Sequence, residues 1–174
     1  MQVHDLLQSH LRSLNLDTQF ILKTSPHWGS QSPDHRAEIK SALLQNSELK
    51  YHSVSHCPEE GGFIQYSLPV GFDIEITARV LKNTVQRISS LQEVEDSPSP
   101  ASLWCAKEAT FKALQGFTQP SVVSKISIGG WSRISPQLET FELKNSGDFI
   151  SHLKSYGVVI HKTHLTYAFF VIRS

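Results

Sequence analysis

Residues 104–114 read Trp-Cys-Ala-Lys-Glu-Ala-Thr-Phe-Lys-Ala-Leu, and they predict the helix around which the rest of the chain is organised. The stretch consists of good helix formers and has no internal Gly or Pro. Pro100 suits a first helical turn, and Gln115-Gly116 suits the end. At about 100° per residue, Glu108 and Lys112 are neighbours on one face. The opposite, core-facing stripe is predicted to contain Leu103, Ala106, Thr110, Ala113 and Leu114.

Lys107 falls inside the apolar arc of this helix. An unpaired buried ammonium is costly, so this lysine must extend outward along its stem or find an anion. Taken alone, this stretch has two equally good interpretations. It is either a surface helix with one Glu–Lys pair or a helix that presents Glu108 and Lys112 to a functional site. Trp104 and Phe111 share the apolar arc, so we expect them to be packing residues.

The composition excludes several broad classes of protein. The chain has 174 residues, 39% hydrophobic and 18% charged, which is ordinary for one large domain or two small subdomains that share a core. Sixteen Lys and Arg balance sixteen Asp and Glu, so the overall charge does not support a nucleic-acid or membrane-surface role. Cys57 and Cys105 form no metal or redox spacing. We see no signal peptide and no membrane span, and therefore expect a cytoplasmic protein with reduced thiols.

Residues 70–76, Val-Gly-Phe-Asp-Ile-Glu-Ile, form the second informative stretch. Side chains alternate on a strand, so Asp73 and Glu75 share one face, where two carboxylates repel each other. A divalent cation would relieve this repulsion, because carboxylate oxygens are the hard ligands that Mg²⁺ prefers. Gly71 on the same face leaves room for a bulky group to approach the backbone. The core-facing residues are predicted to be Val70, Phe72, Ile74 and Ile76.

The remaining patterns predict a mixed α+β fold with antiparallel pairing, since hairpins outnumber βαβ alternations. Residues 93–100, acidic and then rich in Ser and Pro, are predicted to be an exposed connector, short enough for Asp73, Glu75 and Glu108 to converge. Further helices are predicted at residues 3–14, after Ser32-Pro33-Asp34, at 81–91 and at 148–156. Further strands are predicted at residues 18–24, 51–57, 61–68, 122–128, 138–143, 157–164 and 165–172.

Two basic residues and a histidine lie upstream of these stretches. Arg36 and Lys40 are one turn apart on the outer face of a predicted helix, where they repel each other unless an anion lies between them. A solvated basic face is the alternative. His56 lies near the end of the strand predicted at 51–57, and from the strand alone it is a half-exposed polar residue.

Residues 71–75, followed at a moderate distance by residues 104–112, resemble the two-part signature of the 4′-phosphopantetheinyl transferase superfamily. That signature is G-[VI]-D, often continued as D-x-E, and then [FW]-[CST]-x-K-E-[AS]-x-x-K; only Phe72 departs from it. Residues 54–57, Val-Ser-His-Cys, resemble the family's S-H-S segment, with Cys in place of the second Ser. Residues 36–43 more loosely resemble an R-x-x-A-x-x-A-L helix of the larger members.

The resemblance implies transfer of the 4′-phosphopantetheine arm of coenzyme A to a serine of an acyl or peptidyl carrier protein. In such a reaction Asp73, Glu75 and Glu108 hold Mg²⁺ against the diphosphate oxygens of coenzyme A. Lys112 contacts the same diphosphate as a point charge. The serine proton goes to Glu108 or to a metal-bound water, and the sequence does not choose between them.

The same resemblance assigns roles to the other basic residues. His56 resembles the family's phosphate-contacting His. Lys107 is a second phosphate partner or a support of its helix. Arg36 and Lys40 meet the 3′-phosphate end of coenzyme A, which relieves their mutual repulsion.

Members of the family come in two builds: a small type that assembles as a trimer, and a large type with two similar halves in one chain. The segment before Asp73 is too long for the small type and short for the large one. We interpret the chain as a shortened large type, similar to the surfactin-synthetase-activating proteins. It would have two pseudo-twofold-related α+β halves, a reduced N-terminal half at residues 1–68 and a half at 69–174 with the metal site, as a monomer or homodimer.

Two other functions stay open. The first is an idle relative that binds coenzyme A or a carrier protein without turnover; the intact acids argue against it, because loss of function should release them from their repulsion. The second is another Mg²⁺-dependent phosphoryl-transfer enzyme, such as a phosphatase or nuclease. A nuclease should show a basic groove with aromatic residues, which the neutral composition does not support.

Overall fold

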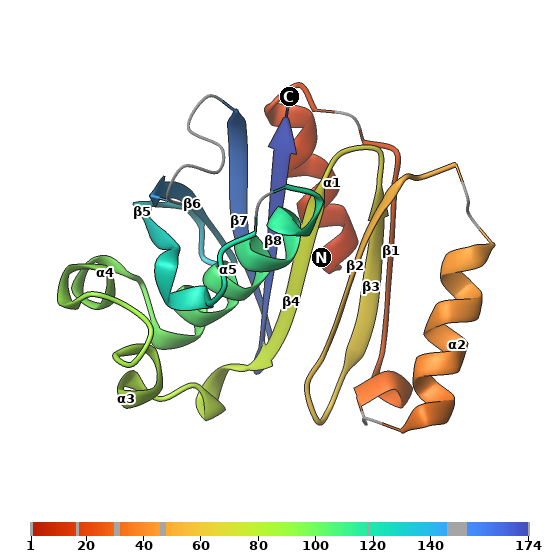
Figure 1. The fold of residues 1–174 in the computed structure, drawn as a ribbon, viewed down its shortest axis with the longest axis horizontal. Helices are drawn as coiled ribbons and strands as arrows, with labels where there is room; N and C mark the ends of the chain where they lie inside the picture. Colours follow the sequence, from red (N-terminus) through yellow and green to blue (C-terminus); the bar gives the residue numbers. More distant parts are fainter. Residues whose placement is uncertain are drawn as a thin grey trace.

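The structure, a computed structural model, has the predicted mixed α+β architecture and contains two antiparallel sheets (Figure 1). It describes residues 2–16, 18–29, 32–45, 48–117, 119–145 and 153–173. The α-helices are α1 (Val3–Ser13), α2 (Pro33–Leu44), α3 (Lys82–Val85), α4 (Leu91–Asp96) and α5 (Pro100–Ala113). The strands are β1 (Phe20–Ser25), β2 (Tyr51–His56), β3 (Gly61–Tyr66), β4 (Val70–Ile76), β5 (Ser127–Ser135), β6 (Leu138–Asn145), β7 (Lys154–Lys162) and β8 (Leu165–Arg173). Short 3₁₀ turns cover Pro26–Gly29, Thr77–Arg79, Leu114–Gly116 and Val123–Lys125.

The first sheet has the strand order β1-β3-β2. Strands β2 and β3 form the predicted antiparallel hairpin. Helix α2 lies beside this sheet (Figure 1) and begins as its sequence indicates. The Oγ of Ser32 accepts a hydrogen bond from Asp34 N (3.3 Å), and Pro33 occupies the first turn.

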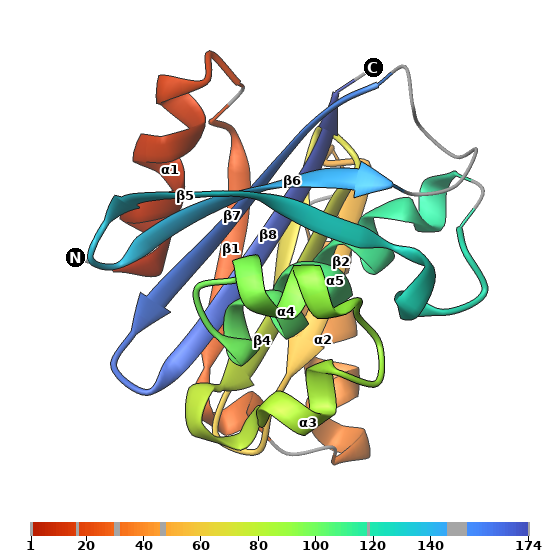
Figure 2. The same ribbon diagram turned by 90° about the vertical axis from the view of Figure 1, so that its left-hand side faces the viewer.

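The second sheet has the order β4-β8-β7-β6-β5 and a helix on each of its two faces. Figure 2 shows α1 and α5 on opposite sides of β7 and β8. Successive side chains of these strands therefore enter two different cores. The core under α1 includes Val158, Ile160, Tyr167, Phe169 and Val171. The core under α5 includes Val159, Ala168, Phe170 and Ile172.

Strand β2 of the first sheet lies beside β4 of the second (Figure 1). Two serine side chains of β2 join the strands. Ser53 Oγ accepts a hydrogen bond from Phe72 N (3.0 Å), and Ser55 Oγ accepts one from Ile74 N (3.2 Å). Both serines are buried. These hydrogen bonds give the β4 amides partners where no strand ladder joins the two sheets. This seam brings the end of β2 to the acidic face of β4.

Helix α5 crosses β4 at very short range, and Gly71 makes this possible. A Cβ atom at this position would lie 1.7 Å from Ala109 O and 2.6 Å from Ala113 N. The bulky group that approaches the backbone at Gly71 is therefore the helix itself. Because strand and helix touch here, Asp73 on β4 lies within reach of Lys112 on α5.

Most predicted elements are confirmed, with ends that differ by a few residues. They are the helices at 3–14 and after Ser32, the helix that contains residues 104–114, and the strands at 18–24, 51–57, 61–68, 70–76, 138–143, 157–164 and 165–172. The predicted core stripe of α5 is buried at every position. On β4, Val70, Phe72 and Ile74 are buried, and Ile76 packs against the same core.

The helix predicted at 81–91 is wrong. The chain forms the short helix α3, then a turn, and starts α4 at Leu91; Leu81 and Leu91 are 56% and 66% exposed. The reason is a capping box that starts a new helix. Ser90 Oγ accepts a hydrogen bond from Glu93 N (3.2 Å), and Ser90 N donates to Glu93 Oε2 (2.9 Å).

Three further predictions about connecting regions are wrong in part. The connector predicted at 93–100 contains the end of α4, and Glu93 in it is buried rather than exposed. The strand predicted at 122–128 starts only at Ser127, after a 3₁₀ turn. The helix predicted at 148–156 is wrong for residues 154–156, which pair with β8 in the sheet, so tertiary pairing overrides the local helical pattern. Residues 148–152 lie outside the described residues.

The two sheets fall on either side of residue 68, the predicted boundary between the halves 1–68 and 69–174. Helix α1 belongs to the first half by sequence but packs against β7 of the second. The boundary itself stays a prediction.

Candidate functional site

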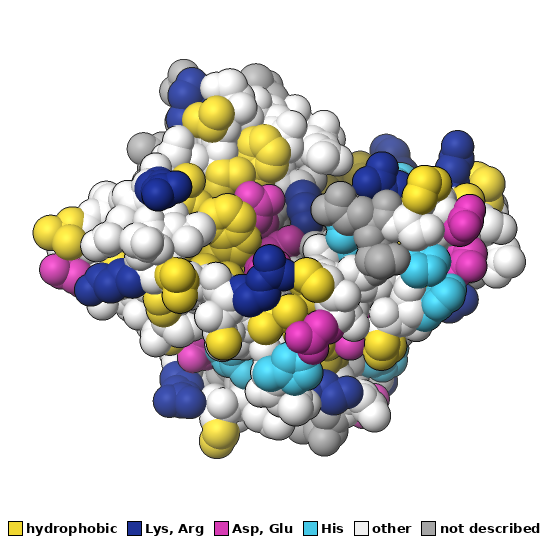
Figure 3. Space-filling view, turned by 90° about the horizontal axis from the view of Figure 1, so that it is seen from below, with side chains coloured by type: hydrophobic (Ala, Val, Ile, Leu, Met, Phe, Trp, Pro, Cys, Tyr) yellow, Lys and Arg dark blue, Asp and Glu magenta, His cyan; other side chains and the backbone are white. Residues whose placement is uncertain are grey.

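The acids and basic residues predicted for the site come from α2, β2, β4 and α5. A view of the molecule from below shows acidic side chains near the middle of the face, next to a Lys or Arg and bordered by hydrophobic side chains (Figure 3). We call Asp73, Glu75 and Glu108 the acid cluster, and Arg36, Lys40 and His56 the basic group.

Asp73 is at the centre of the acid cluster and is 6% exposed. Its Oδ1 accepts hydrogen bonds from Lys112 Nζ (2.7 Å) and Ser55 Oγ (2.8 Å). Lys112 Nζ also donates to Ser55 Oγ (3.1 Å) and to Phe72 O (3.0 Å). The lysine therefore neutralises Asp73 at short range and links α5 to both β4 and β2.

Glu75 and Glu108 are partly buried and lie in the field of Asp73. Burial raises the pKa of Glu75, and the negative charge of Asp73 raises it further. The pKa of Glu108 is likewise raised, first by burial and then by Asp73, while Lys112 acts in the opposite direction. The structure thus brings the three acids into one electrostatic environment in which their ionised forms repel each other.

The acid cluster provides the carboxylate oxygens that a cation site needs, but its three side chains do not converge on one point. Within the described ranges, no three His, Cys, Asp or Glu side chains are grouped closely enough to hold a metal ion. Oδ2 of Asp73 is buried and accepts no N–H or O–H hydrogen bond from the described residues, while the buried Cys105 thiol contacts the same carboxylate. A buried polar atom without a partner is costly, and a carboxylate oxygen suits Mg²⁺. The residues present therefore fit a hard divalent cation.

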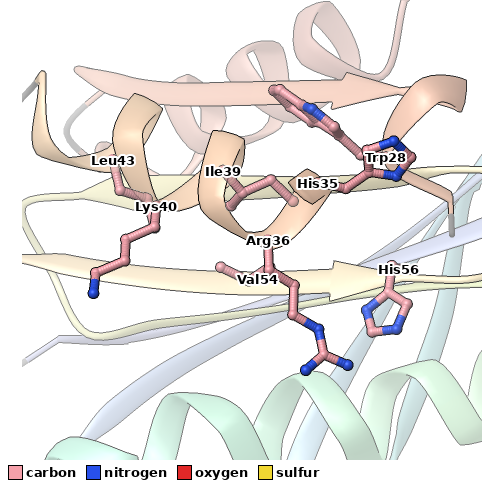
Figure 4. Close-up of a pocket in the computed structure, with 8 residues that line it drawn as sticks. All are labelled: Trp28, His35, Arg36, Ile39, Lys40, Leu43, Val54 and His56. Carbon is pink, nitrogen blue, oxygen red and sulfur yellow. The ribbon is translucent and has the colours of Figure 1, made fainter. Parts of the chain in front are cut away.

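The basic group lines a cavity of about 150 Å³ between α2 and β2, with Ile39 and Val54 on its apolar wall (Figure 4). The side chains of Arg36, Lys40 and His56 point toward the same side of this cavity. Burial lowers the pKa of His56, and the positive charges of Lys112 and Arg36 lower it further. His56 directly follows Ser55 on β2, so the cavity lies close to the contact between Ser55 and Asp73. Its positive charge suits an anionic group.

Lys107 does not join either group. It is fully buried, and its ammonium lies 2.8 Å from Glu93 Oε1, 2.9 Å from Ile88 O and 2.6 Å from Ile126 O. These three oxygens use all three donors of an ammonium. Because Lys107 is also fully buried, whereas Lys112 is partly exposed, the geometry favours the other predicted role of Lys107, support of the helix. The buried lysine finds the anion that its position in the apolar arc requires.

Two functional residues were not assigned a role from the sequence. Ser55, in the S-H-S-like segment, bonds to both Asp73 and Lys112; its alternation with Ser53 along β2 was the available signal, since both serines share a face. Glu93 holds Lys107, and the signal there was the S-x-x-E spacing from Ser90.

Several expectations about the rest of the chain can also be compared with the structure. Trp104 and Phe111 are partly buried and pack against the core under α5, as predicted. Cys57 and Cys105 are buried and not joined in a disulfide. None of the helices in the described ranges is long and apolar enough to cross a membrane.

The acid cluster with its paired lysine and the cavity of the basic group offer the charges that a cation and a phosphate-bearing ligand would need. Residues 69–168 match the family model of the 4'-phosphopantetheinyl transferase superfamily, and this range contains the acid cluster and the whole of α5. The match covers more than half of the chain, which belongs to this superfamily. Membership supports phosphopantetheine transfer, with coenzyme A as the donor, as the general activity. A search of curated proteins found no matching sequence.

Proposed function

We propose that the protein transfers the 4′-phosphopantetheine arm of coenzyme A to a serine of an acyl or peptidyl carrier protein, as a Mg²⁺-dependent holo-carrier-protein synthase. The observation that carries this proposal is the state of Asp73. Its Oδ1 is bound by Lys112 and Ser55, and its charge acts on two further acids, Glu75 and Glu108. Family membership supplies the donor.

Asp73, Glu75 and Glu108 would hold the cation. When bound, Mg²⁺ would neutralise charge on the diphosphate of coenzyme A and so favour displacement at phosphorus. The side chain of Lys112 is 22% exposed and lies in the acid cluster, so its positive charge would act on the same diphosphate, and a direct contact would replace one of its three present acceptors.

The cavity of the basic group would receive the 3′-phosphate end of coenzyme A. Arg36 and Lys40 project from one face of α2, and His56 lies opposite them on β2 (Figure 4). An anion between these side chains would reduce the repulsion between Arg36 and Lys40. His56 of the cavity directly follows Ser55, which donates to Asp73, on β2, so a single ligand with phosphates at both places would fit this arrangement.

In the reaction, the hydroxyl oxygen of the carrier serine attacks the phosphorus that bears the pantetheine arm. A new P–O bond forms, the bond to the neighbouring phosphate breaks, and adenosine 3′,5′-bisphosphate leaves. Glu108, or a water held by the cation, would accept the serine proton.

The test is a mass measurement on carrier proteins. Incubation of the protein with an apo carrier, coenzyme A and Mg²⁺ should increase the carrier's mass by one phosphopantetheine group. A panel of fatty-acid, polyketide and peptide carriers covers the pathways, and Asp73→Ala and Glu108→Ala should both be inactive. No mass increase with any carrier, despite binding of coenzyme A, would instead indicate an idle relative.

The remaining parts of the proposal concern compartment and assembly. The two unpaired cysteines fit a reducing compartment, which supports the cytoplasm. We infer a monomer or a homodimer, and size-exclusion chromatography with light scattering decides between them.

A further inference from the structure

Two aromatic side chains are neighbours of Glu108 on the surface of α5. Trp104 lies one turn before Glu108, and Phe111 lies three positions after it. Each ring packs against the core under α5, but neither side chain is fully buried, in contrast to the core stripe of the same helix. Part of each ring therefore remains open to solvent beside the acid cluster.

Trp104, Glu108 and Lys112 form one row along α5, at a spacing of four residues. At 1.5 Å per residue, this row extends about 12 Å along the helix axis. Its Lys112 end touches the first sheet, because Lys112 Nζ donates to Ser55 Oγ of β2 (3.1 Å). Helix α5 starts on the side of α4 and ends on the side of β2 (Figure 1). The Trp104 end of the row therefore lies away from the cavity of the basic group.

The row follows the order of the groups in coenzyme A. In the proposed function, the 3′-phosphate lies in the cavity of the basic group, and the diphosphate lies at Lys112 and Glu108. The pantetheine arm leaves the diphosphate on the side opposite the nucleotide. With the nucleotide on the β2 side, the arm extends along α5 toward Trp104, and Phe111 lies beside its course.

The chemistry of the aromatic pair suits this arm. The pantetheine arm is uncharged and carries a dimethyl-substituted carbon and methylene groups, separated by two amides. An aromatic ring offers apolar surface to the carbon groups, and the indole N–H of Trp104 offers a donor to an amide oxygen. Among the described residues, that N–H has no acceptor. Trp104 can thus contact both kinds of group in the arm.

Trp131 provides an internal comparison. It packs against the same core from β5, where its ring centre lies 5.5 Å from that of Phe141, and its Nε1 is buried. Both tryptophans contribute apolar surface to one core, but only Trp104 is a neighbour of Glu108. A variant at Trp131 therefore separates loss of packing from loss of a contact at the site.

We propose that Trp104 and Phe111 bind the pantetheine arm of coenzyme A, so that recognition of the donor does not depend on its phosphates alone. This inference rests on the proposed function, because it takes the diphosphate to lie at Lys112 and Glu108. It adds two aromatic residues to a site whose predicted residues are all acids and bases.

The experiment compares coenzyme A with adenosine 3′,5′-bisphosphate, which lacks the arm, by titration calorimetry. The ratio of the two affinities isolates the contacts of the arm. Trp104→Ala should weaken binding of coenzyme A by about fivefold or more and binding of the bisphosphate by less than about twofold. Trp104→Phe should retain most of the affinity for coenzyme A. Trp131→Ala removes an equal ring from the same core and should leave the ratio unchanged.

Each outcome decides one claim. An unchanged ratio in Trp104→Ala, or the same change of ratio in Trp131→Ala, would show that Trp104 only packs against the core, and would leave the proposed function intact. If the wild type binds neither compound, the proposed function itself is refuted. If Trp104→Ala does not fold, Phe111→Ala gives the same test: a lowered ratio supports the inference, and an unchanged ratio overturns it.

Discussion

At the scale of single residues, the Asp73 carboxylate connects the two kinds of charge in the site. It is buried, ion-paired with Lys112 at 2.7 Å, and exerts its charge on both Glu75 and Glu108. A buried acid with a lysine on one side and two acids on the other contributes little to the stability of the fold. This loss of stability is expected where the site must also bind a metal cation.

Asp73→Asn is therefore expected to remove function while preserving shape. The amide has the size of the carboxylate but lacks its charge, so Lys112 loses its counterion and a cation loses a ligand. We expect a fall of at least about 100-fold in the rate of carrier modification, with the melting temperature lowered by only a few degrees. Asp96→Asn, at an exposed aspartate of α4, serves as control and should behave as the wild type. A near-normal rate in Asp73→Asn would contradict the assignment.

Glu108→Gln should lose activity and gain stability. Because burial and Asp73 raise the pKa of Glu108, the folded state holds its proton more tightly than the unfolded state, and stability falls as the pH rises through the raised pKa. Glutamine does not ionise, so the variant should not lose stability in this way. At pH 8 the variant should melt roughly 1–3 °C above the wild type, and the difference should vanish toward pH 4. A variant that is less stable at pH 8 would contradict the electrostatic account.

The relative placement of the signature residues could be predicted from the sequence, but the side chains that they contact could not. Alternation on one strand places Asp73 and Glu75 on a common face, and helical spacing places Glu108 next to Lys112. The sequence also required an anion for Lys107 but did not identify it. Glu93 is separated from that lysine by a turn and a helix start, and only the tertiary packing of α4 on α5 joins them.

At the scale of elements, the close packing of α5 on β4 determines where the signature side chains lie. Gly71→Ala should disrupt it, since the new Cβ would meet the Ala109 carbonyl oxygen at 1.7 Å. We expect a loss of about 3 kcal/mol or more in the free energy of unfolding, or a failure to fold, measured by chemical denaturation. Gly116→Ala is the matched control, because its Cβ would meet nothing nearer than 3.9 Å. Equal stability of the two variants would show that α5 can move without cost.

The buried pair of Glu93 and Lys107 fixes α4 and β5 to α5. Glu93 accepts hydrogen bonds from Lys107, Ser90 N and Ile128 N, while Lys107 also bonds to two backbone carbonyls. Burial raises the pKa of Glu93, but the hydrogen bonds from Lys107, Ile128 N and Ser90 N, together with the charge of Lys107, outweigh it, and the pKa is lowered overall. Its contribution to stability is thus present above the ordinary pKa of a glutamate and is lost as the pH falls through the lowered value.

Lys107→Met should leave Glu93 buried without its counterion and cost about 3–5 kcal/mol. The double variant Glu93→Gln/Lys107→Met should recover part of this loss, and its stability should depend less on pH below about 5. Urea unfolding at several pH values measures both effects. Additive losses in the double variant would show that the two side chains do not act as a pair.

Elements with strong periodicity were predictable, and those defined by local caps or distant pairing were not. The apolar pattern identified α1, α5 and most strands. It failed at 81–91, where the Ser90–Glu93 capping box starts a new helix, and at 154–156, where pairing with β8 imposes a strand.

At the scale of the whole molecule, the site depends on contacts between the two sheets. The serine seam joins β2 to β4, and the β2–β3 turn reaches the second sheet through Glu59 with His164 (2.6 Å) and Glu60 with Tyr167 (2.8 Å). These contacts hold the basic cavity beside the acid cluster. Motif spacing identified both groups, but it could not predict the seam that places one next to the other.

The most direct test of the account is a crystal structure of the protein with coenzyme A and Mg²⁺. We predict a cation bound by Asp73, Glu75 and Glu108, in contact with the diphosphate, and the 3′-phosphate in the cavity of Arg36, Lys40 and His56. Coenzyme A bound elsewhere, or a cation that touches the diphosphate but none of the three acids, would contradict it.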